Sequence, residues 1–260
     1  MSARSDQVAL VTGTSSGIGE ALAQELIRRG WRVFGVSRRS SAIGSPLYSH
    51  LRADLREVAT LAARLEPQVE AAVSDPSLRR FALVNNAAGP GLLGPLDGVK
   101  AEDLLELYAV NVAAPVSLMG WFVRRSRPGL ALRMVNVSTG AATAAFPGLG
   151  AYGSSKAALR MAGMVLAAEL EGRDPEGPAR DITILSYEPG IVDTEMQAAV
   201  RGSSKETVPM VEMFRQVAAE GRLVPPKEPA AEIADYLEAD GHARFTERRL
   251  GVPPTQKAAG

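Results

Sequence analysis

The sequence predicts an α/β fold in which helices cover both faces of a parallel β-sheet. Short apolar runs alternate along the chain with stretches whose apolar residues recur at helical spacing, a pattern of repeated βα units. The runs are continuously apolar, as expected for strands that are buried on both faces. A glycine-rich turn joins the first run to the first helical stretch. Because crossovers between parallel strands are right-handed, these units predict a doubly wound, Rossmann-type sheet.

The expected elements follow this pattern in order. Strands are predicted where apolar, often β-branched residues run together, at 8–11, 32–36, 81–84, 133–137 and 182–186. Helices are predicted where the apolar spacing is helical, at 20–29, 58–73, 101–123, 154–170, 206–219 and 230–237. The third of these helices contains Pro115, where we expect a break.

No linker divides the chain, so we expect one Rossmann-type domain over residues 1–260. The segment at about 197–228 carries Met210 and Met213 and is expected to act as a lid over the substrate. Residues 252–260 are rich in Pro and Ala and are expected to form a loose tail.

Composition excludes several function classes. Lys and Arg number 29, as do Asp and Glu, which argues against binding nucleic acid or an acidic membrane through bulk charge. The chain has no Cys and only two His, so neither a thiolate nucleophile nor a metal site is expected. The N-terminal segment lacks a secretory pattern, and we expect no membrane-spanning helix. These features predict a soluble, cytoplasmic protein.

The glycine-rich turn is a candidate phosphate-binding site. Gly13 permits a tight turn, Gly17 lets the backbone approach a pyrophosphate, and Gly19 lets the helix pack against the strand. The helix N-terminus offers free N–H groups to an anion. The turn also contains Ser15, Ser16 and Ile18. Glycines alone fit an ordinary turn equally well, and it is the strand-turn-helix context that favours phosphate binding.

The end of the second strand bears on the choice of nucleotide. Sites that prefer NAD carry an acidic residue here for the ribose 2′-hydroxyl. This chain has Ser37 followed by Arg38 and Arg39. A guanidinium suits a 2′-phosphate, so we expect NADPH, with Arg38 as the main contact and Arg39 as its neighbour. The alternative is a solvated basic loop.

A Tyr and a Lys four residues apart form a candidate acid-base pair. Tyr152 and Lys156 lie on one face of their helix. A nearby Lys charge lowers the pKa of a phenol, so Tyr152 is expected to exchange a proton with a carbonyl oxygen. Ser138 follows a strand at the sheet edge where ligands gather, and its hydroxyl is placed to hold that oxygen. Asn111 interrupts an apolar helix and needs a partner if it is buried.

These motifs resemble, in order, those of the short-chain dehydrogenase/reductase family. The resemblance rests on TGxxxGxG at 12–19, Asp54-Leu55, NNAAG at 85–89, Asn111, Ser138, YxxxK at 152–156, and Pro189-Gly190. It implies that Asp54, beside Leu55, accepts from the adenine amino group and that Asn86, Ala87 and Ala88 border the adenosine. It also implies that Asn111 supports a proton relay and that Lys156 holds the ribose. The segment expected along the nicotinamide comprises Pro189, Gly190, Ile191, Val192 and Thr194.

Within the family, the stretch from Glu188 to Gln197 resembles sepiapterin reductases and benzil reductases. Those sepiapterin reductases anchor the pterin through a C-terminal Asp, which this chain lacks, and Glu247 is the candidate replacement. The resemblance implies an NADPH-dependent reductase of a ketone or 1,2-dicarbonyl. The alternative is an NADP-binding sensor or scaffold without turnover. The family resemblance also implies a homodimer that is paired through helices 101–123 and 154–170, with a tetramer as the alternative.

Overall fold

The computed structural model describes residues 5–89, 92–171, 173 and 180–252. Its centre is a seven-stranded sheet in the order β3-β2-β1-β4-β5-β6-β7, and all of the pairings are parallel. This confirms the predicted α/β fold class. The strands are β1 (Gln7–Thr12), β2 (Arg32–Ser37), β3 (Tyr48–Arg52), β4 (Arg80–Asn85), β5 (Ala131–Val137), β6 (Ile182–Glu188) and β7 (Phe245–Arg249).

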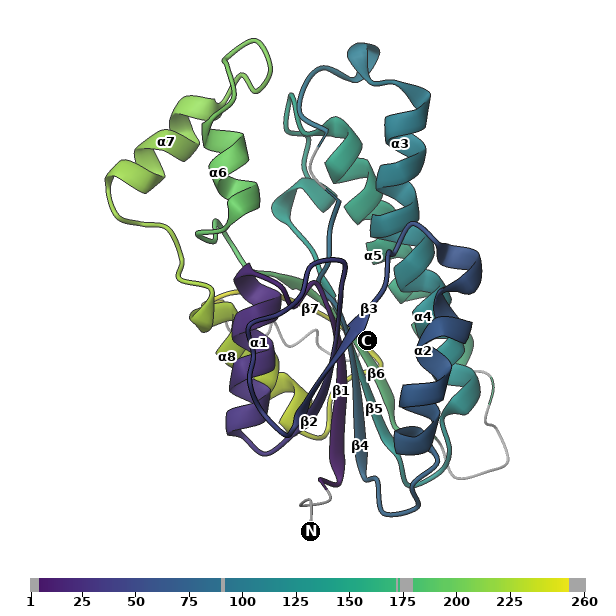
Figure 1. Ribbon diagram of the computed structural model, residues 1–260. Helices are drawn as coiled ribbons and strands as arrows, with labels where there is room; N and C mark the ends of the chain where they lie inside the picture. Colours follow the sequence, from purple (N-terminus) through teal and green to yellow (C-terminus); the bar gives the residue numbers. More distant parts are fainter. Residues whose placement is uncertain (1–4, 90–91, 172, 174–179, 253–260) are drawn as a thin grey trace.

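Helices cover the sheet on both faces (Figure 1). On one face lie α1 (Gly17–Arg28) and α8 (Lys227–Glu238), which pack with the sheet around the buried side chains of Leu22 and Ile233. On the other face lie α2 (Val58–Val73), α4 (Ala114–Arg125) and α5 (Gly150–Glu171), around Leu65 and Phe122. The burial of apolar side chains on both faces explains why the central strands are continuously apolar.

The strand order reverses between β1 and β4, so the connections that leave these two strands diverge at the carboxyl edge of the sheet. In open α/β sheets this is where ligands bind. Helices α3 (Ala101–Tyr108), α6 (Glu195–Arg201) and α7 (Val211–Ala219) rise beyond this edge (Figure 1). Two short 3₁₀ turns, η1 (Leu96–Gly98) and η3 (Gly140–Ala142), belong to the same end of the molecule.

The predicted strands and the helix at 58–73 are confirmed, the latter with the same bounds. The helix expected at 206–219 begins only at Val211, because Pro209 disfavours helical backbone in the residue before it. The structure adds β3, β7 and α6, which the sequence pattern did not predict. The loose tail expected at 252–260 lies outside the described residues, apart from Val252.

The long helix expected at 101–123 is distorted rather than broken. A π-helical turn, η2 (Ala109–Ala113), joins α3 to α4, and Pro115 lies in the first turn of α4. The Pro115 ring cannot accept a regular turn against the carbonyl of Asn111, four residues earlier, so the extra residue of the π turn precedes it. The stretch Ala101–Arg125 is long and apolar enough to cross a membrane, which we did not expect. However, α4 packs against α2 and α5 as a core helix does.

A glycine on β2 makes room for a contact between an edge strand and the first turn. The hydroxyls of Tyr48, on β3, and of buried Thr14 are 2.9 Å apart and share a hydrogen bond. A Cβ at Gly35 would lie 2.5 Å from Thr14 Oγ1 and would collide with the Tyr48 hydroxyl. Gly35 is therefore required by close packing rather than by its backbone conformation.

We predict that Gly35→Ala destabilises the protein by about 1–3 kcal/mol, because the added methyl overpacks this slot. Tyr48→Ala vacates the same space, so the double variant should lose less stability than the two single changes together. Denaturant unfolding of the four proteins measures this coupling. Gly44→Ala is the control, since nothing lies within 4 Å of its added Cβ. Equal midpoints for Gly35→Ala and Gly44→Ala would contradict the prediction.

Candidate functional site

The turn after β1 has the shape of a phosphate cradle. Gly13 and Gly17 adopt φ angles of +78° and +61°, a region that favours glycine. A Cβ at Gly19 would lie 2.5 Å from the Asn86 side-chain nitrogen, so only glycine fits there. Ile18 points into the core, while Ser15 and Ser16 are half-buried at the turn. The start of α1 leaves backbone N–H groups available to an anion, so these residues fit a dinucleotide pyrophosphate.

The loop after β4 is tied directly to this turn. The Asn86 side chain donates to the carbonyl oxygens of Thr12 (2.9 Å) and Gly13 (3.4 Å). The backbone N–H groups of Asn86 and Ala87 both donate to Thr12 Oγ1. The resemblance implied that Asn86 borders the adenosine; in the structure its amide fixes the cradle itself. Ala87 and Ala88 are half-buried beside it.

The residues after β2 reach toward the cradle and toward α6. Ser37 Oγ donates to the Arg39 carbonyl oxygen at 2.8 Å. The Arg39 guanidinium donates to Ser16 Oγ at 3.1 Å and pairs with Glu195 at 3.0 Å. Arg38 is exposed and forms no hydrogen bond or ion pair with another described residue. Two guanidinium groups therefore flank the place where a ribose 2′-substituent is expected.

The adenine end of the site carries one carboxylate. Asp54 accepts hydrogen bonds from the Arg56 guanidinium and from the Arg56 backbone N–H. These bonds, with a smaller contribution from the charge of Arg38, hold the pKa of Asp54 below its usual value. Leu55 is buried beside it. Asp54 is thus an ionised acceptor, as its expected role with an adenine amino group requires.

Tyr152 and Lys156 lie one turn apart near the start of α5. Lys156 is buried, and its Nζ donates to the Val137 carbonyl oxygen at 2.8 Å, while lying 5.8 Å from the centre of the Tyr152 ring. Burial raises the pKa of Tyr152 to about 12 and lowers that of Lys156 to about 8. The expected lowering of the Tyr152 pKa by Lys156 is therefore wrong for this structure, because burial outweighs a charge that contacts a carbonyl rather than the phenol.

Ser138 is brought to the same end of the sheet. It follows β5, its backbone N–H donates to the Tyr187 carbonyl oxygen at 2.6 Å, and its side chain is half-buried. The chain then forms η3, which packs against the start of α5. A Cβ at Gly153 would lie 2.7 Å from the Ala141 carbonyl oxygen, which shows how closely the two approach. The Ser138 loop and the helix of Tyr152 thus share one edge.

Asn111 is fully buried in the π turn, and both ends of its amide are used. Its Oδ1 accepts from the Gly89 backbone N–H at 2.8 Å, and its Nδ2 donates to Ser155 Oγ at 2.9 Å. The partner that the sequence required is therefore present. This network connects the loop after β4 to the residue beside Lys156. The proton relay implied by the resemblance stays a prediction.

The segment after β6 closes the site on the side of α6. Pro189 is buried, and Gly190 has a φ of +75°. Val192 forms a parallel bridge with Val224, and the Ile191 carbonyl oxygen accepts from the Val224 backbone N–H. Thr194 caps α6 by accepting from the Gln197 backbone N–H at 3.3 Å.

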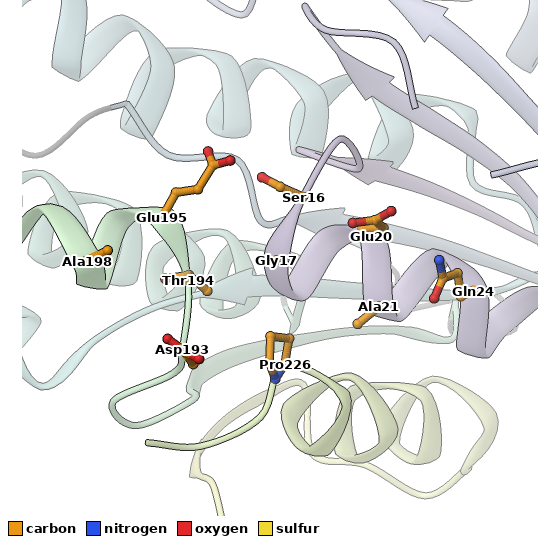
Figure 2. A pocket seen from close by; sticks show the side chains of 10 residues that line it. All are labelled: Ser16, Gly17, Glu20, Ala21, Gln24, Asp193, Thr194, Glu195, Ala198 and Pro226. Carbon is orange, nitrogen blue, oxygen red and sulfur yellow. The ribbon is translucent and has the colours of Figure 1, made fainter. Parts of the chain in front are cut away.

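A cavity of about 560 Å³ separates the first turn of α1 from α6. Figure 2 shows Ser16 and Gly17 on one side, and Thr194 and Glu195 on the other. A Cβ at Gly17 would lie 3.2 Å from Thr194 Cγ2, so the two sides nearly touch at one point. This cavity lies between the phosphate cradle and the segment after β6.

A small hydrophobic cluster is built around the segment from α6 to α7. Buried Val208, Val211 and Phe214 pack against Leu93, Leu149, Ile191, Val200 and Met210. Glu247 takes no part in it. Its carboxylate pairs with Arg160 on α5 through two bonds of 2.5 and 2.8 Å. The role of Glu247 in place of the pterin-anchoring Asp stays a prediction, and in this structure its carboxylate is engaged by Arg160.

Sequence reasoning missed four residues of the site. Thr12 and Ser155 provide hydroxyls that join the loops, and Tyr48 braces Thr14 from an edge strand. Glu195 reaches Arg39 across the cavity. Thr12 and Ser155 adjoin Gly13 and Lys156 in sequence, so adjacency could have suggested them. The other two contacts are long-range, and no local pattern marks them.

Known proteins are similar in sequence to this chain. The family model described as short chain dehydrogenase matches residues 7–205. A benzil reductase that forms (S)-benzoin, from Bacillus subtilis strain 168, is 32% identical over 88% of this chain and 92% of its own length. Sepiapterin reductase of Mus musculus is 30% identical over 90% of this chain and 92% of its own length.

A solved structure has the same fold. A short chain dehydrogenase/reductase from Saccharomyces cerevisiae superposes with a TM-score of 0.78 and 26% identity, covering 95% of this chain and 97% of that one. The family model, the relatives and the geometry of the site indicate the same family. The chain belongs to the short-chain dehydrogenase/reductase family, and it is an oxidoreductase that acts on a small molecule with a nicotinamide cofactor.

Proposed function

We propose that this protein is an NADPH-dependent carbonyl reductase that acts on ketones or 1,2-dicarbonyl compounds of the benzil type. The observation that carries the proposal is buried Lys156, one helical turn from Tyr152 and beside the Ser138 loop. The similarity to a benzil reductase over most of both chains supports the substrate class. The ion pair that holds Glu247 disfavours a pterin relative to a simpler dicarbonyl.

The residues fit the acid-base half of a reduction. With pKa values of about 12 and 8, Tyr152 and Lys156 are both protonated at neutral pH. Tyr152 is then the donor that a developing alkoxide needs, and Ser138 holds the same oxygen by a hydrogen bond. Lys156 is also charged at neutral pH, and its charge offsets part of the cost that burial imposes on the phenolate that remains. When bound, the reduced nicotinamide supplies the hydride.

The proposed NADPH preference rests on Ser37, Arg38 and Arg39. Ser37 stands where an acidic residue would repel a 2′-phosphate. Arg38 is unengaged by other described side chains, and its charge reaches Asp54 at the adenine end. We assign the cradle, Asp54 and the segment 189–194 to the rest of the cofactor, with 197–228 as a lid of the same domain.

The direct test is cofactor consumption with benzil and sepiapterin in parallel, with NADPH and NADH compared. We expect NADPH consumption with benzil. Sepiapterin turnover with tight saturation would indicate that Glu247 or another group anchors a pterin. Faster turnover with NADH would overturn the roles given to Arg38 and Arg39.

We predict that Tyr152→Phe lowers turnover by about 10²- to 10⁴-fold, the usual contribution of a positioned proton donor. Cofactor binding, measured by fluorescence, should remain, because no cradle residue changes. Tyr187→Phe is the matched control, since its hydroxyl bonds Glu232 on α8. Unchanged turnover in Tyr152→Phe would overturn the role of Tyr152 as proton donor, and a wild-type protein that binds the cofactor without turnover would favour a sensor over an enzyme.

The pKa of Lys156 gives a pH dependence. Lys156 is charged below its pKa of about 8 and neutral above it, so the rate of reduction should fall as the pH rises through that value. A rate profile between about pH 6 and pH 10 checks this. Lys156→Arg keeps its charge over that range, so any residual activity should lack the decline. The same decline in both proteins would assign it to another group.

We also propose a cytoplasmic homodimer paired through α4 and α5. Val116 on α4, and Met161 and Val165 on α5, are large apolar side chains exposed by 39–53%. We predict that Met161→Glu shifts the mass measured by light scattering from twice 27.4 kDa to that value. Met213→Glu, on α7, should leave the dimer intact. A monomeric wild-type protein would refute the pairing.

A further inference from the structure

Arg39 joins two elements across the mouth of the cavity. Its Nη2 donates to Ser16 Oγ at 3.1 Å and to Glu195 Oε2 at 3.0 Å, and its Nη1 lies 3.5 Å from Glu195 Oε1. Ser16 is the last residue before α1, and Glu195 opens α6. Figure 2 shows Glu195 and Ser16 on facing sides of the cavity. Arg39 thus links the phosphate cradle to α6.

The neighbouring arginine, Arg38, differs from Arg39 in its bonding partners. Arg38 makes no hydrogen bond or ion pair with another described residue, and its positive charge helps to lower the pKa of Asp54. Only one of the two guanidinium groups beside the proposed 2′-phosphate position is therefore free to receive it. The other already holds a carboxylate.

We propose that Glu195 is a specificity-determining residue that competes with the cofactor 2′-phosphate for Arg39. The inference rests on the NADPH preference proposed above. A carboxylate and a phosphate both use the guanidinium fork, and one fork cannot serve both fully. Arg38 therefore binds the 2′-phosphate first. Arg39 binds the phosphate only after its ion pair with Glu195 breaks. That exchange removes the link between Arg39 and α6.

The size of the effect follows from exposure. The side chains of Arg39 and Glu195 are 62% and 71% exposed, so their ion pair is screened by water. Exposed pairs contribute little to stability, and competition from such a pair changes affinity by a modest factor. Glu195 consequently weakens the preference for the 2′-phosphate without abolishing it.

The test is calorimetric binding of two cofactor fragments that differ only in the 2′-phosphate, adenosine 2′,5′-bisphosphate and AMP, so no turnover is needed. Wild-type protein should bind the bisphosphate more tightly than AMP. Glu195→Gln should tighten the bisphosphate by about three- to tenfold and leave AMP within about twofold. The Gln keeps the shape of the side chain but loses the charge that holds Arg39.

Two further variants show whether Glu195 acts on the affinity for the 2′-phosphate through Arg39. Glu20→Gln removes a carboxylate from the same cavity without touching Arg39, and it should leave both affinities unchanged. Arg39→Ala should weaken the bisphosphate, and adding Glu195→Gln to it should restore nothing. Equal gains in Glu20→Gln and Glu195→Gln, or a gain that survives in Arg39→Ala, would overturn the competition.

The fragment comparison also separates this inference from the cofactor assignment. If wild-type protein does not favour the bisphosphate, the NADPH preference fails and the role of Glu195 fails with it. If wild-type protein favours the bisphosphate and Glu195→Gln binds it no better, the preference stands and the role of Glu195 is overturned.

Discussion

The close approach of the turn after β1 to the loop after β4 is the constraint on which the rest of the site depends. The Asn86 amide spans the two, and a Cβ at Gly13 or Gly19 would lie 2.8 or 2.5 Å from its nitrogen. Thr12 Oγ1 accepts two backbone N–H groups from the opposite loop. The fold achieves this approach because β1 and β4 are neighbours in the sheet although far apart in sequence. The shape of the cradle is therefore set by tertiary packing as much as by its own glycines.

The same polar contacts extend from the cradle to the acid-base pair. Gly89, four residues after β4, donates to Asn111, and Asn111 donates to Ser155. Ser155 in turn donates to the Tyr152 carbonyl oxygen at 2.7 Å, which anchors the helix that carries Tyr152 and Lys156. Buried polar groups that are fully paired fix one arrangement, because each alternative leaves a donor or acceptor without a partner. The distance between cofactor cradle and proton donor thus depends on a few buried side chains.

Features that are determined by residues close together in the sequence could be predicted, and features that depend on distant contacts could not. Central strands such as β4 are continuous apolar runs, so their pattern is plain. The edge strands β3 and β7 are half-exposed and read as polar segments, and only pairing with β2 and β6 makes them strands. In the site, the glycine turn and the Tyr152-Lys156 pair follow from spacing. The pKa of Tyr152 does not, because burial that is visible only in the fold outweighs the nearby charge.

The α6–α7 segment is joined to the rest of the fold by two backbone connections that lie side by side. It leaves the sheet after Gly190 and returns at Val224, where the bridge between Val192 and Val224 pins both connections together. Its far end packs against Gly148, where a Cβ would lie 2.9 Å from Val208 Cα. Between these two supports, Glu195 and Arg39 make an exposed contact with the cradle. Exposed ion pairs are weak and screened, whereas close backbone packing is not. The contact between Glu195 and Arg39 is therefore the one that an incoming anionic group can exchange at least cost to the fold.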